Sequence, residues 1–193
     1  MTGSKEGRYI TPFAAIIGGA RFVVRASAGD EPGNFTLEHG DARIPVDHPS
    51  DLLAAAPAGE RVTADYGAFT LTVWQGEDGR PRYRAAAQGK EPAEDDDDEE
   101  RACWRLLALL GDASAPRACF FCRWSEVEPS AGWGNLGCAV ESATAYDAIA
   151  RSTDSRRRKW GPQGLLEWVD EWAVCERFEV RPLGYGYRGR PTI

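Results

Sequence analysis

The stretch VTADYGAFTLTVWQGEDGRPRYRAAA, residues 62–87, decides the fold class. Phe69, Leu71 and Val73 alternate with other residues, which is the period of a strand with one buried face. The four residues Gly76–Gly79 then supply a tight turn before a second β-like run. The pattern predicts an antiparallel hairpin.

The chain before this hairpin repeats the same design. Two further pairs of β-like runs are separated by turn residues, Gly18-Gly19 in the first pair and His39-Gly40-Asp41 in the second. Pro57 ends a short helical stretch over residues 50–56. We therefore expect residues 1–88 to be a β-rich region of antiparallel hairpins.

Residues 89–100, GKEPAEDDDDEE, contain no large apolar side chain. Such a composition predicts an acidic linker or a mobile loop, which is either a domain boundary or an insertion in one domain. Its last acidic residues precede a predicted helix over residues 101–110, whose dipole they favour.

The region 101–193 mixes both kinds of element. Strands are predicted over 117–126, 135–141 and 178–183, and helices over 143–151 and 163–176. In the last helix the apolar stripe is Leu165, Trp168, Val169 and Trp172. The predicted fold class is α+β, with helices of the C-terminal half packed on an antiparallel sheet. Residues 1–88 and 101–193 are either separate regions or parts of one continuous domain.

Composition limits the classes of function. The chain has 193 residues and a net charge of −7, which is not the basic character of a general nucleic-acid binder. No run of 18 apolar residues predicts a membrane span. Twenty arginines against three lysines fit a high-GC, bacterial coding genome. Five cysteines, an odd number, favour reduced thiols and a cytoplasmic location.

The cysteines raise the question of a metal. Cys119 and Cys122 form a C-x-x-C within a β-like run, where alternation would point the two thiols to opposite faces. Buried thiols are the favoured interpretation, and no cofactor is expected. The alternative is a structural zinc held by Cys119, Cys122, Cys138 and Cys175.

Two other patterns resemble sites but fit poorly. Gly132–Gly137 has the spacing G-x-G-x-x-G, yet neither a strand directly before it nor a helix directly after it is predicted. Its glycines are better explained by close packing of two strands. His39, Asp41, Asp47 and His48 are close in sequence, but a hairpin would hold the two histidines about 25–30 Å apart.

A basic run gives the clearest local binding signal. Arg156, Arg157, Arg158 and Lys159 precede Trp160, and aromatic and basic residues recur at Trp133, Tyr185, Tyr187 and Arg188. Charge together with stacking rings is typical of contacts to phosphate or single-stranded nucleic acid.

No catalytic motif was found, and the sequence predicts a cytosolic, non-catalytic binding or accessory protein that acts through a protein partner. The acidic run and the surplus of aromatic residues, which are favoured interface anchors, motivate this hypothesis. One alternative is a small enzyme with its site near residues 119–138 and the C-terminal tail, lined by Arg123, Glu126, Trp133 and Tyr187. The other is a nucleic-acid contact through residues 156–159.

Overall fold

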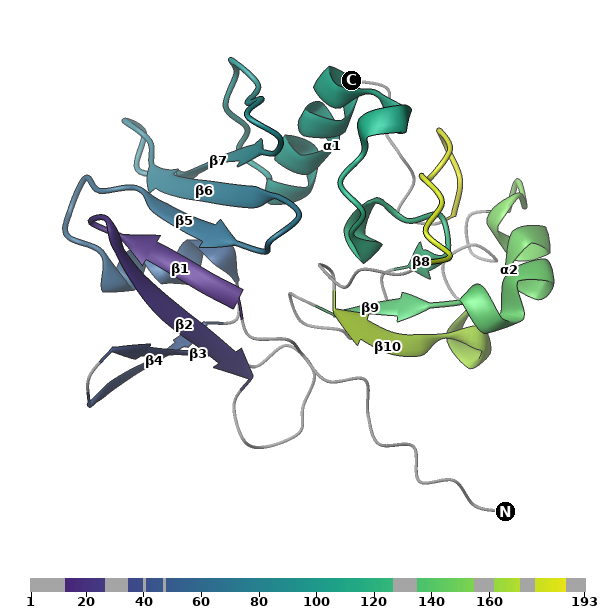
Figure 1. The fold of residues 1–193 in the computed structure, drawn as a ribbon, viewed down its shortest axis with the longest axis horizontal. Coiled ribbons are helices and arrows are strands. Elements are labelled where there is room, and N and C mark those ends of the chain that lie inside the picture. The colour runs from purple at the N-terminus through teal and green to yellow at the C-terminus, as the bar shows by residue number, and fades with distance from the viewer. Residues whose placement is uncertain are drawn as a thin grey trace.

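The computed structural model describes residues 13–26, 35–39, 41–46, 48–126, 135–154, 162–170 and 176–186. Its main feature is a curled antiparallel sheet of seven strands in the order β4-β3-β2-β1-β5-β6-β7 (Figure 1). The strands are β1 (Phe13–Ile17), β2 (Ala20–Ala26), β3 (Phe35–His39), β4 (Ala42–Val46), β5 (Val62–Asp65), β6 (Thr70–Gln75) and β7 (Pro81–Ala86).

The predicted hairpins are confirmed. β1 pairs with β2, β3 with β4, and β6 with β7 through the turn at Gly76–Gly79. The apolar run of residues 62–74 is two strands rather than one, because the Asp65 carboxylate accepts a hydrogen bond from the Gly67 N–H and Gly67 has a φ of +80°. That tight turn lets β5 and β6 pair within one short stretch.

The core lies on one face of this sheet. The alternating side chains Phe69, Leu71 and Val73 are all buried, as their spacing predicted. The 3-10 helix η1 (Pro49–Ala55) covers this face through the fully buried Leu52, and α1 (Glu99–Leu110) packs beside β7. Trp104 of α1 is 2% exposed and contributes the largest fully buried side chain.

The acidic segment is attached to the sheet, in contrast to the linker or mobile loop expected over residues 89–100. Tyr83 and Asp96 exchange both backbone hydrogen bonds, and the Asp96 side chain is only 3% exposed. Arg84 pairs with Glu91 and Asp95, and Arg105 with Glu94 and Asp96. Arginines of the same chain therefore hold the acidic residues, which composition alone does not reveal. The division into domains at 88 and 100 remains a prediction.

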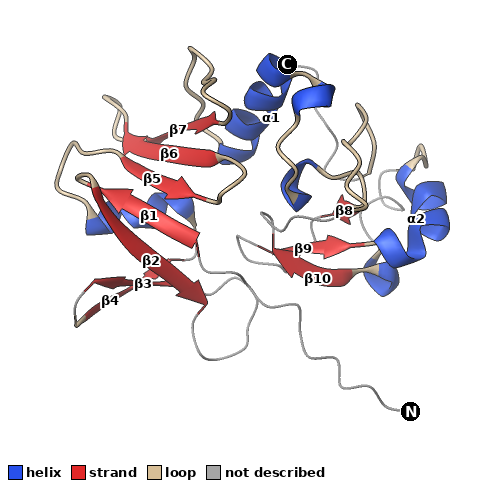
Figure 2. Ribbon diagram, viewed as in Figure 1, coloured by secondary structure: helices blue, strands red, loops and turns tan. Residues whose placement is uncertain are grey.

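The second half contains a small antiparallel sheet in the order β10-β9-β8 (Figure 2). Its strands are β8 (Ser125–Glu126), β9 (Asn135–Cys138) and β10 (Glu167–Asp170), and α2 (Ala143–Ala150) follows β9. The predicted helix over 143–151 is confirmed, although Ser142 makes no side-chain capping hydrogen bond.

Three predicted elements of this half were wrong in type or length. The run 117–126 begins as a 3-10 helix, η3 (Cys119–Phe121), and only its last two residues form a strand. In place of the predicted helix 163–176, the described residues 163–170 form a short 3-10 helix, η5 (Gln163–Leu165), and then β10, and residues 171–175 lie outside the described part of the chain. Residues 178–183 make a single bridge, Val180 to Cys122, instead of a full strand.

One apolar core links the two halves. Phe120 and Phe121 of η3 belong to the same buried cluster as the strands of the large sheet. The Phe121 ring centroid lies 5.4 Å from that of Phe69 and 5.9 Å from that of Trp104. Aromatic pairs at this separation add attraction to the area they bury. The second half is thus anchored through η3 on the core of the first.

Candidate binding groove

Most of the predicted binding residues lie outside the described part of the chain. This applies to Arg156, Arg157, Arg158, Lys159, Trp160, Trp133, Tyr187 and Arg188. The nucleic-acid contact through residues 156–159 therefore stays a prediction.

Of the predicted binding residues, Tyr185 lies in the described part of the chain. It is 5% exposed, its hydroxyl donates to the Asp147 carboxylate at 2.5 Å, and the Arg123 guanidinium lies 4.8 Å from its ring centroid. Burial and the bond to Asp147 raise the pKa of Tyr185, while the hydroxyl and Arg151 lower the pKa of Asp147. These contacts fix the C-terminal segment against α2.

The Glu126 side chain is buried in the protein interior. Its side chain is 1% exposed, it accepts a hydrogen bond from the Tyr146 hydroxyl at 3.0 Å, and it lies 3.7 Å from the Arg181 guanidinium. Arg181 is 0% exposed and donates to the carbonyls of Cys122 and Ser125. The alternative hypothesis of a small enzyme requires the side chains of Glu126 and Arg123 to line one open pocket.

Arg123 belongs to a different network from Glu126. It pairs with Asp147 at 2.5 Å and with Glu179 at 2.9 Å, and its guanidinium lies 4.4 Å from the Trp124 ring centroid. Neither of the hollows described below is lined by Arg123 or Glu126. Arg123 and Glu126 both form ion pairs within the chain, whereas the alternative sequence-based hypothesis placed them in an enzyme site.

The cysteines are buried, as predicted for Cys119, Cys122 and Cys138. Cys119 and Cys138 share an apolar cluster with Leu136 and Val169. The argument that Cys119 and Cys122 alternate along a strand was wrong, because Cys119 begins η3. Among the described residues no three His, Cys, Asp or Glu side chains gather as metal ligands, and Cys175 lies outside them.

Gly137 confirms that glycine permits close packing in the second sheet. A Cβ built on it would lie 2.5 Å from Cδ1 of Leu166. The first part of the G-x-G-x-x-G pattern lies outside the described residues.

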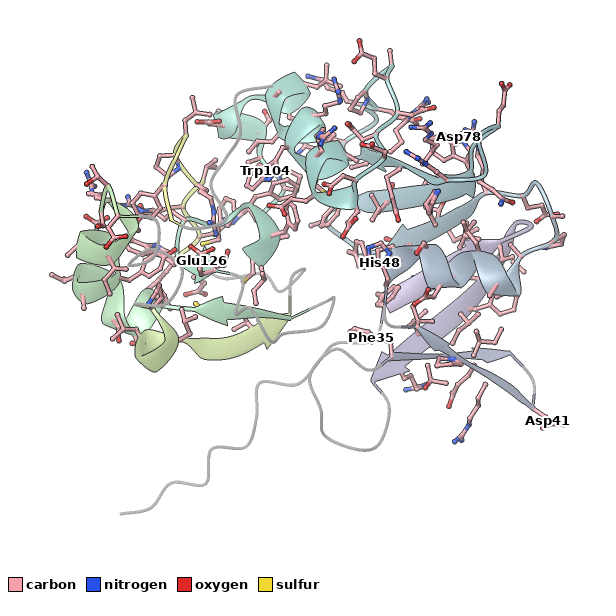
Figure 3. The ribbon with its side chains drawn as sticks, turned by 180° about the vertical axis from the view of Figure 1, so that it is seen from behind. Phe35, Asp41, His48, Asp78, Trp104 and Glu126 are labelled. Atoms are coloured by element: carbon pink, nitrogen blue, oxygen red, sulfur yellow. The ribbon has the colours of Figure 1, made fainter. Side chains whose placement is uncertain are left out.

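His48 takes part in a contact that the sequence did not indicate. Its Nε2 lies 3.1 Å from Oε1 of Glu99, 51 residues away, and its Nδ1 lies 2.8 Å from the Ser50 hydroxyl. The hydrogen bond with Glu99 raises the pKa of His48. Burial raises the pKa of the nearby Tyr83 to about 12. His48 caps η1 and ties it to α1, so it is a structural residue rather than a partner of Asp41 (Figure 3).

A groove of about 750 Å³ lies beside the β6–β7 hairpin. We call it the acidic groove, and its lining residues are Trp74, Gly76, Glu77, Asp78, Arg82, Ala93, Glu94 and Asp95. Two stretches build it, the hairpin turn and the acidic segment docked along β7. Figure 3 shows Asp78 at the outer end of the hairpin, far from the core residues Phe35 and Trp104.

The turn holds its own acid in place. The Asp78 carboxylate accepts hydrogen bonds from the Arg80 N–H at 3.1 Å and from the Arg82 guanidinium at 2.8 Å. These donors, the Arg80 N–H first, lower the pKa of Asp78 and keep it ionised. Gly76 is needed because a Cβ there would lie 3.0 Å from both Asp78 Oδ1 and Arg82 Nε. The hairpin tip is therefore a preformed wall of the groove.

The other wall is charged but largely compensated. On this wall Asp95 pairs with Arg84 and Glu94 with Arg105. On the hairpin wall, Glu77 makes no ion pair with any described residue. The Trp74 ring lies in the same groove, and the guanidiniums of Arg61 and Arg84 lie 4.4 and 5.6 Å from its centroid. The groove already binds cations of its own chain through carboxylates and an aromatic ring.

Part of this site could be foreseen. The turn Gly76–Gly79 and the position of Trp74 beside it follow from the hairpin pattern. The return of Glu94 and Asp95 to the same place depends on the Tyr83–Asp96 pairing, for which the sequence has no local signal.

None of the helices in the described part of the chain has the length and apolar character required to cross a bilayer. Comparison with protein-family models, with curated proteins and with solved structures gives no match.

Proposed function

We propose that this protein is a cytosolic, non-catalytic binding protein whose acidic groove receives a basic segment of a protein partner. The observation that carries the proposal is the groove itself, in which four carboxylates and one tryptophan share a hollow of about 750 Å³. Hollows of roughly 300–1,000 Å³ are large enough to accept ligand groups. Tryptophan is among the residues that most often anchor interfaces.

The arginines of the same chain support the choice of a basic side chain as the ligand of the groove. Arg82 and Arg84 lie against its carboxylates, and Arg84 also lies near the Trp74 ring. Exposed ion pairs contribute only about 0–1 kcal/mol each. An incoming arginine or lysine can therefore share or replace these partners at small cost, and Glu77 offers a carboxylate without any such partner.

The surrounding charge supports the same choice. Residues 1–100 carry 10 Lys/Arg and 19 Asp/Glu, so the half of the chain that contains the groove is strongly negative. Such a field accelerates encounter with a basic partner and makes association sensitive to salt.

The test compares two hairpin tips. Glu77→Lys reverses the uncompensated charge of the acidic groove, and Asp41→Lys makes the same change at the β3–β4 tip, far from the groove (Figure 3). Each variant and the unmodified protein capture proteins from a lysate of the source cell. The captured protein is then purified, and its affinity is measured by calorimetry at about 50 mM and 300 mM salt.

We expect Glu77→Lys to weaken the complex by about tenfold or more, Asp41→Lys to leave it unchanged, and high salt to weaken it. Equal affinity of both variants, or affinity that does not depend on salt, would assign the contact to another surface and refute the proposal.

A further inference from the structure

A second hollow of about 270 Å³ lies where β1, β2, β3 and the end of η1 meet. We call it the Glu60 pocket, and its lining residues are Ile17, Gly18, Phe22, Leu37, Ala55, Pro57 and Glu60. It belongs to the core side of the sheet, because Phe22 and Ala55 pack against the main buried cluster. The acidic groove lies on β6 and β7, so the two hollows share no residue.

Small residues leave this space open. Gly18 forms the β1–β2 turn with a φ of +55°, and Ala55 ends η1 with a single methyl group. The Glu60 N–H donates to the Pro57 carbonyl at 3.0 Å, which closes a turn through Gly59 at a φ of +83°. The turn fixes Glu60 beside the opening.

Among the described residues that line the pocket, Glu60 alone carries a charge. Its carboxylate lies against Gly18, since a Cβ on that glycine would be 3.2 Å from Glu60 Oε2. It is half-buried and makes no ion pair with any described residue. Other carboxylates of the same sheet are paired, Asp65 with Arg21 and Glu38 with Arg25. A half-dehydrated carboxylate without a counter-ion favours a cation supplied from outside.

We propose that the Glu60 pocket binds a small organic ammonium ion with an apolar body. The volume is near the lower limit of small-molecule sites, about 300 Å³, which suits a ligand of fragment size. Ile17, Phe22 and Leu37 would bury the apolar body, and Glu60 would pair with the ammonium group. An anionic ligand of the same shape is disfavoured by the like charge. This site is independent of the acidic groove, so either proposal can fail without the other.

Three probes of similar shape separate the contribution of the ligand's charge to binding from that of its apolar body. They are 2-phenylethylamine, 2-phenylethanol and 3-phenylpropionate, which carry a positive charge, no charge and a negative charge on similar phenylalkyl bodies. Each is titrated into the full chain with labelled Ile and Leu methyl groups, and NMR shifts of Ile17 and Leu37 report occupancy. We expect the amine to bind with a Kd on the order of 0.1–1 mM and about tenfold more tightly than the alcohol, a difference of about 1.4 kcal/mol.

Three variants complete the test. Glu60→Gln keeps the shape and should abolish the preference for the amine over the alcohol. Ala55→Leu fills the pocket and should remove binding of all three probes, with a retained methyl spectrum as the sign of intact fold. Asp41→Asn at the exposed β3–β4 tip is the matched control and should leave binding of the amine unchanged.

Several results would overturn the proposal. They are equal or tighter binding of the alcohol or the acid, no saturable shift at Ile17 and Leu37 up to about 10 mM amine, or an unchanged amine preference in Glu60→Gln. Shifts of the same methyl groups on dilution without any probe would assign the pocket to a second copy of the chain instead.

Discussion

Removing the guanidinium of Arg181 should be among the most damaging single changes in the chain. Arg181 is fully buried, donates from one nitrogen to the carbonyls of Cys122 and Ser125, and lies 3.7 Å from Glu126. At that separation two opposite charges attract by about 4–5 kcal/mol with an effective dielectric constant near 20. Arg181→Met loses this attraction, removes the guanidinium donor from the carbonyls of Cys122 and Ser125, and takes away the positive charge beside the buried Glu126 carboxylate. We expect a loss of about 3–5 kcal/mol in the free energy of unfolding.

A double-mutant cycle tests the cause of this loss. Glu126→Gln keeps an acceptor for the Tyr146 hydroxyl but removes the negative charge. In Arg181→Met/Glu126→Gln neither charge of this pair remains, so the cost should fall below the sum of the single costs by about 2 kcal/mol or more. Urea unfolding by far-UV circular dichroism measures all four proteins at one pH. Costs that add within about 0.5 kcal/mol would show that the two charges do not interact and would refute the reasoning.

Three further predictions concern other contacts. The hydrogen bond with Glu99 raises the pKa of His48, so this contact stabilises the fold fully below the unfolded pKa of about 6.5 and less as pH rises through the folded pKa. Glu99→Gln should therefore lower the pKa of His48 in an NMR titration, and an unchanged midpoint would contradict this. Phe121→Ala should cost about 3–5 kcal/mol and unfold both halves in one transition, because its ring joins their core; a cost below about 1 kcal/mol would argue against a shared core. Gly137→Ala should cost about 1–3 kcal/mol through its clash with Leu166, and Leu166→Ala in the same chain should relieve most of that cost; equal stability of Gly137→Ala and the original protein would exclude the clash.

The first sheet was predictable because its signals are local. Two-residue alternation at Phe69, Leu71 and Val73 selects the buried face, and turn residues such as Gly18-Gly19 set the ends of the strands. Pairing between neighbouring strands then follows from the short turns alone. The order of seven strands adds two steps, the pairing of β3 with β2 and the return of β5 to pair with β1.

The second half was harder because its elements are too short for a period to decide their type. Leu165 and Val169 fit a helical stripe, yet the chain forms a single 3-10 turn and then a four-residue strand. Leu166 packs on Gly137, and β10 pairs with β9, so a tertiary contact overrides the local pattern.

Site residues are hard to predict for a related reason. Glu126, Arg123 and Tyr185 have the residue types of an active site, but buried charge networks use the same types, and only three-dimensional partners distinguish the two. The Glu60 pocket carries no motif at all. It results from a glycine, an alanine and a turn that meet from separate parts of the sequence.

The docked acidic segment has a consequence for how the protein avoids its own aggregation. An open sheet presents two edge strands whose unpaired backbone groups can recruit strands from other molecules. Here the Tyr83–Asp96 and Ala87–Lys90 bridges cover part of β7, while Pro45 lies in the middle of β4, where it cannot donate a ladder hydrogen bond. The carboxylates along the covered edge also repel acidic copies of the same chain. Each edge of the sheet is thereby partly blocked to strand addition, by a bridge at β7 and by a proline at β4.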